Sequence, residues 1–155
     1  MQLDIRPADF GDPELKGFLQ DHLDDIAPTA PRESRHALDL AALDAPTVRM
    51  WVGRRDGVLV VTGALVQTDG SGHHEEVKSM RTAPSVRGRG FGRQMVEHLI
   101  HDARHRGVER LWLETGSMPF FEPARALYRS MGFIPCPPFA SYAADPNSTF
   151  MTRDL

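Results

Sequence analysis

Three alternating glycines in S-V-R-G-R-G-F-G-R, residues 85–93, are the residues whose types and spacing most clearly suggest chemistry. Gly88, Gly90 and Gly92 stand where a predicted strand passes into a predicted helix, although glycine costs a helix about 1 kcal/mol relative to alanine. Glycine lets a ligand approach the backbone closely, and the first N–H groups of a helix have no intrahelical partner. Because the helix dipole adds positive charge there, the stretch predicts an anion site rather than a packing contact or a mobile loop.

Three arginines, Arg87, Arg89 and Arg93, add positive charge to this stretch, but they cannot all face one ligand. The spacing matches neither G-x-x-x-x-G-K-[ST] of the P-loop nor G-x-G-x-x-G of dinucleotide-binding folds.

An arginine–glycine patch for RNA would need disordered repeats and a basic chain. Here 18 Lys and Arg face 21 Asp and Glu, a formal charge of −3. We therefore expect no nucleic-acid or membrane partner.

Apolar periodicity predicts the elements that precede the glycine stretch. A short strand is expected at residues 2–6, and Asp12 and Pro13 form a helix start before apolar residues at helical spacing that end near Ile26. A second helix is expected within residues 32–43, with Leu38, Ala41, Ala42 and Leu43 facing inward. Strands are then expected at residues 48–52 and 58–66, joined by a tight turn at Asp56 and Gly57. The unbroken apolar run of the second strand predicts a sheet covered on both faces.

The remaining elements bracket the glycine stretch. In residues 75–83 Val77 and Met80 are three apart, which predicts a bulge in a strand. A helix is expected from the glycines to about Arg106, with an apolar face of Met95, Val96, Leu99, Ile100 and Ala103. The order strand, helix and strand at residues 109–115 indicates a βαβ crossover. A short helix at residues 124–131 and closing strands at residues 133–136 and 148–153 complete the chain.

The spacing Arg87-x-x-Gly90-x-Gly92 resembles the pyrophosphate-binding motif Q/R-x-x-G-x-G/A of the GCN5-related N-acetyltransferases (GNAT). L-Y-R-S-M-G-F, residues 127–133, resembles the second signature of that family, and the element order agrees over nearly the whole chain. The resemblance implies an α/β fold with a mixed, mostly antiparallel sheet of six to seven strands flanked by about four helices. It also implies acetyl-CoA as co-substrate. A length of 155 residues suits a single domain over residues 1–155.

The resemblance assigns the coenzyme to two segments and a tyrosine. The diphosphate would bind the glycine stretch, namely Arg87, Gly88, Arg89, Gly90, Phe91, Gly92 and Arg93. Main-chain groups of Met80, Arg81 and Thr82 would pair with the pantetheine arm, and an N–H near Met80 would bind the thioester oxygen. Tyr128 would lie beside the sulfur, where a phenol with a pKa of about 10 can protonate a thiolate; alternatively it only closes the core. Relatives often carry asparagine where this chain has Phe121, so one coenzyme contact differs.

An amine acceptor with a pKa of about 10.4 must lose a proton before or during attack. The resemblance places a glutamate base near Glu75 and Glu76. Adjacent strand residues face opposite ways, so at most one of them faces the cleft, and we choose Glu76. Alternatively, either residue is a solvated carboxylate at a strand end. His22, Phe139 and Tyr142, with Asn147, are predicted to shape a pocket for a small amine. For His22 itself, a core histidine with a satisfied ring is the preferred interpretation.

No metal is expected, because His98, His101 and His105 point away from the apolar helix face and suit a solvated stripe better than a zinc site.

The single cysteine, Cys136, excludes an internal disulfide and suits a reducing compartment. No leader or apolar span is apparent, which predicts a cytoplasmic protein.

We thus predict an acetyltransferase that moves the acetyl group of acetyl-CoA to a primary amine of a small molecule in a ternary complex. The alternative is a non-catalytic acetyl-CoA sensor or interaction module on the same fold. A homodimer, as in many relatives, is compatible with the chain.

Overall fold

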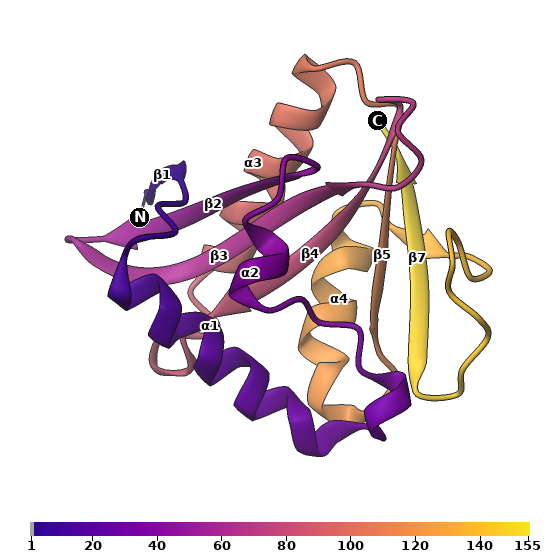
Figure 1. The fold of residues 1–155 in the computed structure, drawn as a ribbon, viewed down its shortest axis with the longest axis horizontal. Helices are drawn as coiled ribbons and strands as arrows, with labels where there is room; N and C mark the ends of the chain where they lie inside the picture. Colours follow the sequence, from indigo (N-terminus) through magenta and orange to yellow (C-terminus); the bar gives the residue numbers. More distant parts are fainter. Residues whose placement is uncertain (1) are drawn as a thin grey trace.

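The computed structural model describes residues 2–155. Their strands form one seven-stranded sheet (Figure 1). The strand order is β1-β2-β3-β4-β5-β7-β6, and only β4 and β5 are parallel neighbours. The strands are β1 (Asp4–Pro7), β2 (Val48–Arg55), β3 (Val58–Gln67), β4 (His74–Thr82), β5 (Arg110–Gly116), β6 (Ile134–Pro135) and β7 (Ser148–Asp154). The mixed, mostly antiparallel sheet predicted from the sequence is confirmed.

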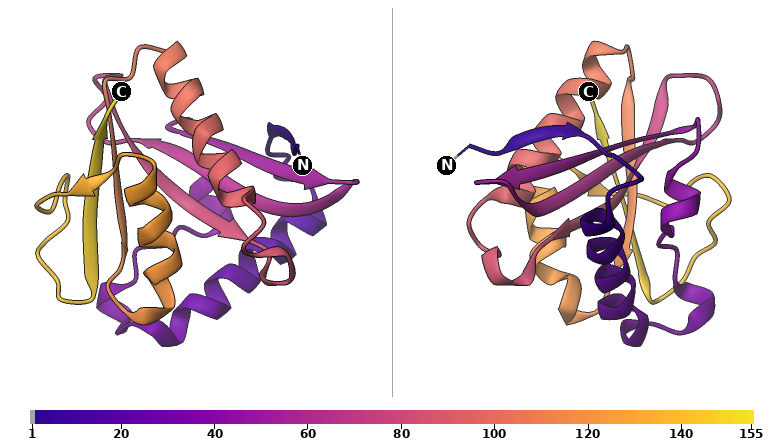
Figure 2. Two further views of the ribbon diagram at one scale, coloured as in Figure 1. Left: turned by 180° about the vertical axis from the view of Figure 1, so that it is seen from behind. Right: turned by 60° about the vertical axis from the view of Figure 1, so that its left-hand side comes forward.

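Within residues 2–155, four α-helices cover the two faces of this sheet, as the views in Figure 2 show. They are α1 (Pro13–Ile26), α2 (Leu40–Leu43), α3 (Phe91–His105) and α4 (Glu122–Ser130). Short 3₁₀ turns are η1 (Ala27–Thr29), η2 (Arg32–Ser34), η3 (Pro84–Val86) and η4 (Pro119–Phe121). Within the described residues, no helix is both long and apolar enough to span a bilayer.

Two hydrophobic cores lie on opposite faces of the sheet, as expected for a strand that is apolar along its whole length. The core under α3 and α4 contains the five predicted apolar residues of α3, all buried. The core under α1 and α2 is smaller and contains Leu15, Leu19 and Leu43. The predicted start of α1 is also confirmed, because the Asp12 carboxylate accepts a hydrogen bond of 2.9 Å from the Glu14 N–H.

The predicted helix within residues 32–43 is wrong over most of its length. Only η2 and the four residues of α2 are helical, and Ala41 and Ala42 are exposed rather than inward-facing. The reason is competition from tertiary contacts. The His36 carbonyl accepts a hydrogen bond of 2.8 Å from Lys78 Nζ, and the Ser34 hydroxyl donates to the Asp145 carboxylate. This segment therefore crosses the end of the sheet as an extended loop.

Candidate active site

A bulge in β4 shapes one end of the sheet. Ser79 has a left-handed backbone with φ of 54°, and Ser79 and Met80 together stand opposite Gly63 of β3. The Thr62 hydroxyl donates a hydrogen bond of 2.8 Å to the Ser79 carbonyl and so holds the bulge. The bulge predicted between Val77 and Met80 is confirmed.

The strands β4 and β5 diverge beyond this point. Their parallel pairing ends at Val77 and Leu113, after which β4 pairs only with β3 and β5 only with β7 (Figure 1). The main-chain groups of β4 that face β5 therefore have no strand partner from Lys78 onward. An opening results between the two strands.

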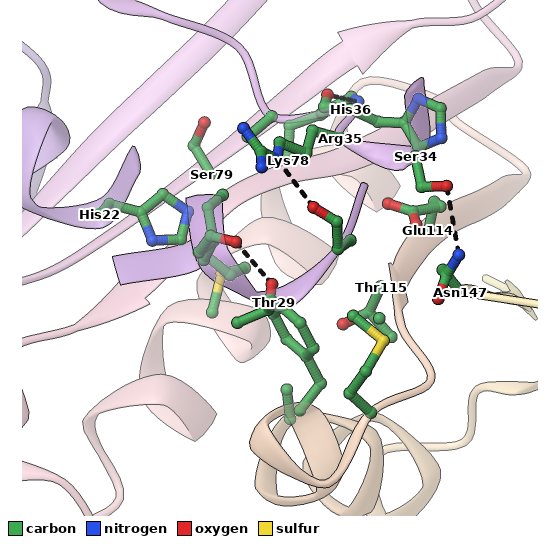
Figure 3. Close-up of a pocket in the computed structure, with 18 of the residues that line it drawn as sticks. His22, Thr29, Ser34, Arg35, His36, Lys78, Ser79, Glu114, Thr115 and Asn147 are labelled. Carbon is green, nitrogen blue, oxygen red and sulfur yellow. Dashed lines mark hydrogen bonds between the residues drawn. The ribbon is translucent and has the colours of Figure 1, made fainter. Parts of the chain in front are cut away.

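A small cavity of about 140 Å³ lies at this opening (Figure 3). Val77 to Met80 of β4 and Glu114 to Gly116 of β5 line two of its sides. Its other lining residues come from the end of α1, the following loop, the region around α4, and the chain before β7: His22, Ile26, Thr29, Ala30, Ser34, Arg35, His36, Ala37, Met118, Phe121, Ala124, Tyr128 and Asn147. Most of the lining therefore comes from segments distant in sequence.

A longer cleft of about 430 Å³ runs from the same place to the start of α3. Nine of the ten residues predicted to bind the coenzyme line it, namely Met80, Arg81, Thr82, Arg87, Gly88, Gly90, Phe91, Gly92 and Arg93. The tenth, Arg89, is exposed and lies outside the lining. The structure therefore brings the glycine stretch and the bulged strand together along one surface.

The first turn of α3 faces this cleft with free main-chain donors. The helical hydrogen bonds begin with the Gln94 N–H, which donates to the Gly90 carbonyl at 3.1 Å. Gly90 caps the helix with φ of 84°, and a Cβ placed on it would meet no atom within 4 Å. A ligand can therefore approach the N–H groups of residues 91–93 through open space, which suits an anion.

Two arginines add positive charge at this end of the cleft. Arg87 donates from Nε to the Thr82 carbonyl at 3.2 Å and forms no ion pair within residues 2–155. Arg93 donates to the Ser130 hydroxyl at 2.8 Å, and the carboxylate of Glu97 is as far as 3.9 Å from it. Both guanidinium groups keep donors for a bound phosphate.

Arg81 differs from these two arginines because its side chain is buried and paired. It forms an ion pair of 2.8 Å with Asp25 and lies over the ring of Phe18, both on α1. Its charge therefore fixes α1 against β4, while its buried Nε has no hydrogen-bond partner among residues 2–155.

The cavity and the cleft meet at six residues that line both: His22, Ile26, Met80, Phe121, Ala124 and Tyr128. Tyr128 is buried at this junction, with its ring against Phe133, and its hydroxyl has no hydrogen-bond partner among residues 2–155. Burial raises the pKa of its phenol well above the usual value. The hydroxyl is therefore protonated at physiological pH and can donate a hydrogen bond to a group placed between the two spaces.

His22 also lies at this junction, where the sequence allowed either a pocket or a core histidine. Burial, together with the charge of Arg81, lowers the pKa of its imidazole to about 4. The ring is consequently neutral at pH 7, so it lines the pocket without adding charge.

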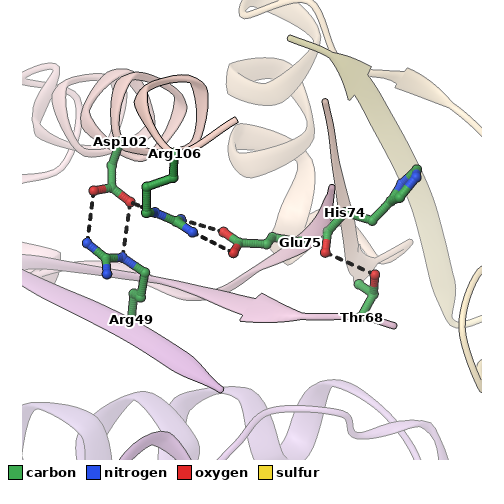
Figure 4. A network of polar contacts seen from close by, with 6 residues as sticks. All are labelled: Arg49, Thr68, His74, Glu75, Asp102 and Arg106. Atoms are coloured by element: carbon green, nitrogen blue, oxygen red, sulfur yellow. Dashed lines mark hydrogen bonds and ion pairs between the residues drawn. The ribbon is translucent and has the colours of Figure 1, made fainter. Parts of the chain in front are cut away.

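Glu75 and Glu76 point to opposite faces of β4, as predicted. Glu75 is 2 % exposed and binds both terminal nitrogens of Arg106, at 2.6 and 2.8 Å, beneath α3 (Figure 4). Arg106 also contacts Asp102, which accepts two hydrogen bonds from Arg49 of β2 (Figure 4). This network ties β4 to α3 and β2, and it leaves Glu75 no access to the opening.

Glu76 lies on the face of the opening but behind the cavity wall. Its carboxylate accepts a hydrogen bond of 2.6 Å from the Tyr142 hydroxyl and is 3.3 Å from Lys78 Nζ. Lys78 in turn donates to the Tyr142 oxygen at 2.7 Å. Glu76 is not among the cavity-lining residues, whereas its partner Lys78 is.

Glu114 of β5 is the carboxylate that lines the cavity directly, and sequence reasoning missed it. Burial raises the pKa of its carboxyl group, although the Ser148 hydroxyl donates to it at 2.7 Å. Alternation with the buried Leu111 and Leu113 placed Glu114 on the opposite face of the strand. Nothing in the sequence indicated that this face lines a cavity.

Phe139 and Tyr142 lie beside the cavity rather than in its lining. They form an aromatic cluster with Trp112 and Phe150, in which ring centroids are 5.1 to 5.8 Å apart. The cluster supports the outer wall, and Asn147 from the same connection does reach the cavity. Phe121 lies at the junction, with its ring against Gly116.

The histidines of α3 are not a uniform solvated stripe. His98 packs against the Trp51 ring at 5.0 Å with a buried Nε2, because β2 lies beneath it, so its solvation was predicted wrongly. His101 and His105 are exposed and stack at 6.4 Å. In the described part of the chain, no three His, Cys, Asp or Glu residues gather as metal ligands would.

Comparison with known proteins gives one consistent result. Residues 15–133 match the model of the acetyltransferase (GNAT) family. An uncharacterized N-acetyltransferase of Bacillus subtilis is 44 % identical over 151 residues, which cover 97 % of this chain and 99 % of the relative. An IAA acetyltransferase of Azospirillum brasilense is 42 % identical over 126 residues, 81 % of this chain and 80 % of that protein.

A solved structure agrees in fold. A crystal structure described as an acyl-CoA N-acyltransferase from Klebsiella pneumoniae superposes with a TM-score of 0.79 at 29 % identity. The match covers 99 % of this chain and 98 % of that one, so it includes every element around the two spaces.

Proposed function

Because the chain belongs to the GNAT family of acetyltransferases, we propose that it moves the acetyl group of acetyl-CoA to a primary amine of a small molecule. The observation that carries this proposal is the meeting of two spaces at Tyr128, a long cleft with anion-binding features and a small cavity with a carboxylate. Such a junction suits direct attack of an amine on a thioester within a ternary complex.

The residues of the cleft fit the coenzyme in shape and charge. The free N–H groups at the start of α3, with Arg87 and Arg93, would bind the diphosphate. The unpaired edge of β4 after Lys78 would bind the amide groups of the pantetheine arm as a neighbouring strand does. This pose places the thioester at the junction beside Met80 and Tyr128.

Three groups would then divide the chemistry. The Met80 N–H would donate to the thioester oxygen as it gains negative charge. Glu114 would take the proton that the amine loses while its nitrogen bonds to the carbonyl carbon, and Tyr128 would protonate the sulfur as the C–S bond breaks. Glu76, the base predicted from the sequence, remains the alternative acceptor of the proton by way of Lys78 and Tyr142.

Calorimetry with acetyl-CoA, followed by thiol release with a panel of small amines, tests this function. We expect saturable binding at micromolar ligand and amine-dependent release of free CoA. Absence of binding at high micromolar acetyl-CoA would refute the proposal. Binding without thiol release for any amine would instead favour the non-catalytic sensor or interaction module.

Replacement of Tyr128 by phenylalanine tests the role of its hydroxyl. The affinity for acetyl-CoA should stay within about twofold, because the ring and its packing remain, while kcat should fall about 100-fold or more, as loss of a general acid typically causes. Steady-state thiol release and calorimetry on the same preparation separate the two effects. Phe133→Leu, which alters the packing of the Tyr128 ring without removing the hydroxyl, serves as the control. Equal turnover in Y128F would remove the acid role.

A further inference from the structure

The charged side chains that line the small cavity differ in how many hydrogen-bond and ion-pair partners they have within the protein. Lys78 has three partners: the His36 carbonyl, the Tyr142 hydroxyl and the Glu76 carboxylate. Its ammonium group therefore needs no ligand. Glu114 and Arg35 are the other two charged residues of the lining, and neither forms an ion pair in the part of the chain that the structure describes.

Arg35 is held at one nitrogen and free at two. Its Nε donates to the Ala30 carbonyl at 3.0 Å, and its two terminal nitrogens have no hydrogen-bond partner among residues 2–155. Figure 3 shows it on the loop segment that borders the cavity opposite α4. A guanidinium group is always charged in proteins, and its paired donors match the two oxygens of a carboxylate.

Other polar residues of the lining include three neutral hydrogen-bonding side chains. Thr29, Ser34 and Asn147 line the same cavity as Arg35 and supply hydroxyl and amide groups. The Asn147 side-chain amide donates to the Ser34 hydroxyl at 3.4 Å. The volume, about 140 Å³, is close to that of a cavity of roughly 150 Å³ that accommodates benzene. The part of the acceptor inside the cavity is therefore small and polar.

We propose that the acceptor is a small amino acid, whose carboxylate binds Arg35 while its amine lies near Glu114. This inference rests on the proposed function and names the substrate class of the same site. One free guanidinium and one carboxylate in the lining complement the two charges of such a zwitterion. The Arg35 residue is exposed at the mouth of the cavity, so with a plain amine its two free nitrogens would contact only solvent, whereas a carboxylate would pair with them. Complementary placement of charges is what distinguishes one ligand from another of similar size.

A matched acceptor panel tests this substrate class. It contains α-, β- and γ-amino acids of up to about five carbons, the amine left after removal of each carboxylate, and each carboxamide. The varied spacing covers the unknown span between amine and carboxylate. The best amino acid should exceed its decarboxylated amine and its carboxamide in kcat/KM by about 10- to 100-fold, the range expected for loss of a charge-assisted hydrogen bond.

Variants of Arg35 test whether this residue causes the preference. Arg35→Gln should lower kcat/KM for the best amino acid about 10- to 100-fold through KM. It should leave the rate with the decarboxylated amine and the affinity for acetyl-CoA unchanged. Arg35→Lys should restore part of the loss. Arg32→Gln is the control, because Arg32 is exposed, lines neither space and forms no ion pair within residues 2–155.

The outcomes separate this inference from the proposed function. Turnover in which amines match or exceed their amino acids, or an unchanged preference in R35Q, would overturn the inference and keep the acetyltransferase function. Acetyl-CoA binding with no turnover of any amino acid in the panel would also overturn it. Absence of acetyl-CoA binding would refute the proposed function itself.

Discussion

Replacing Gly90 by valine is expected to raise the Kd for acetyl-CoA by at least about 100-fold, the equivalent of losing two or more charge-assisted hydrogen bonds. Gly90 has φ of 84° at the start of α3, a conformation that a β-branched residue rarely adopts. A Cβ at this position would meet no protein atom, so the added methyl groups would occupy the space that the diphosphate needs. Calorimetry with acetyl-CoA measures the effect.

Gly107, at the other end of α3, provides a matched control for this substitution. Its φ is 85°, and a Cβ placed on it would also meet no atom within 4 Å. Gly107→Val should therefore suffer a similar backbone strain, about 1–3 kcal/mol, while binding acetyl-CoA normally. If both variants lose binding in proportion to their loss of Tm, the effect of Gly90 is one of stability and the diphosphate site is wrongly placed.

Replacing Glu114 by glutamine is expected to lower kcat about 100- to 10,000-fold, the range typical of a lost general base. Burial raises the pKa of Glu114, so in the native enzyme kcat/KM should fall as the pH is lowered through a value above the usual glutamate pKa of about 4.3. This fall of kcat/KM at low pH, the acidic limb of the pH profile, should disappear in E114Q. A pH series of thiol release with one amine acceptor measures both effects.

Stability provides an independent check on the same variant. Since the folded-state pKa of Glu114 is raised, the unfolded chain binds fewer protons than the folded chain between the two pKa values. The free energy of unfolding should therefore fall as the pH rises through that window. E114Q should thus match or exceed the native Tm at pH 7, which excludes unfolding as the cause of lost activity. The control Glu109→Gln, at an exposed position just before β5, should change neither activity nor Tm.

Comparison with Glu76→Gln distinguishes the two candidate bases. Glu76 holds Tyr142 and Lys78 in the wall of the cavity, so its loss should disturb KM while the acidic limb persists. An acidic limb that vanishes in E76Q and survives in E114Q would assign the base to Glu76 instead.

The sequence predicted the segments that line the proposed coenzyme cleft, because these segments are defined by local features. Three alternate glycines, the strand before them and the apolar face of α3 all lie within residues 74–105, and the conformation of a helix start depends mainly on its own backbone. The bulge in β4 was visible for the same reason, since Val77 and Met80 break the alternation of a single strand.

Predictions failed where contacts between distant segments outweighed local preference. Residues 32–43 have helical spacing, yet Lys78 binds the His36 carbonyl and Asp145 binds Ser34, so the loop follows the sheet end instead. His98 was expected in solvent because its helix face is polar, but the Trp51 ring of β2 covers it.

By itself the sequence determined the family resemblance, the start of α3 at the glycine stretch and the place of Tyr128 in the short helix, since each depends on residues close together in the chain. Only the tertiary structure decided which acidic and basic groups share the small cavity. Strand alternation allowed Glu76 and Glu114 equally, but the divergence of β4 and β5 directs Glu114 into the cavity and leaves Glu76 behind Tyr142. Arg35 reaches the same cavity because packing against the sheet, rather than its own helical propensity, sets the path of its loop.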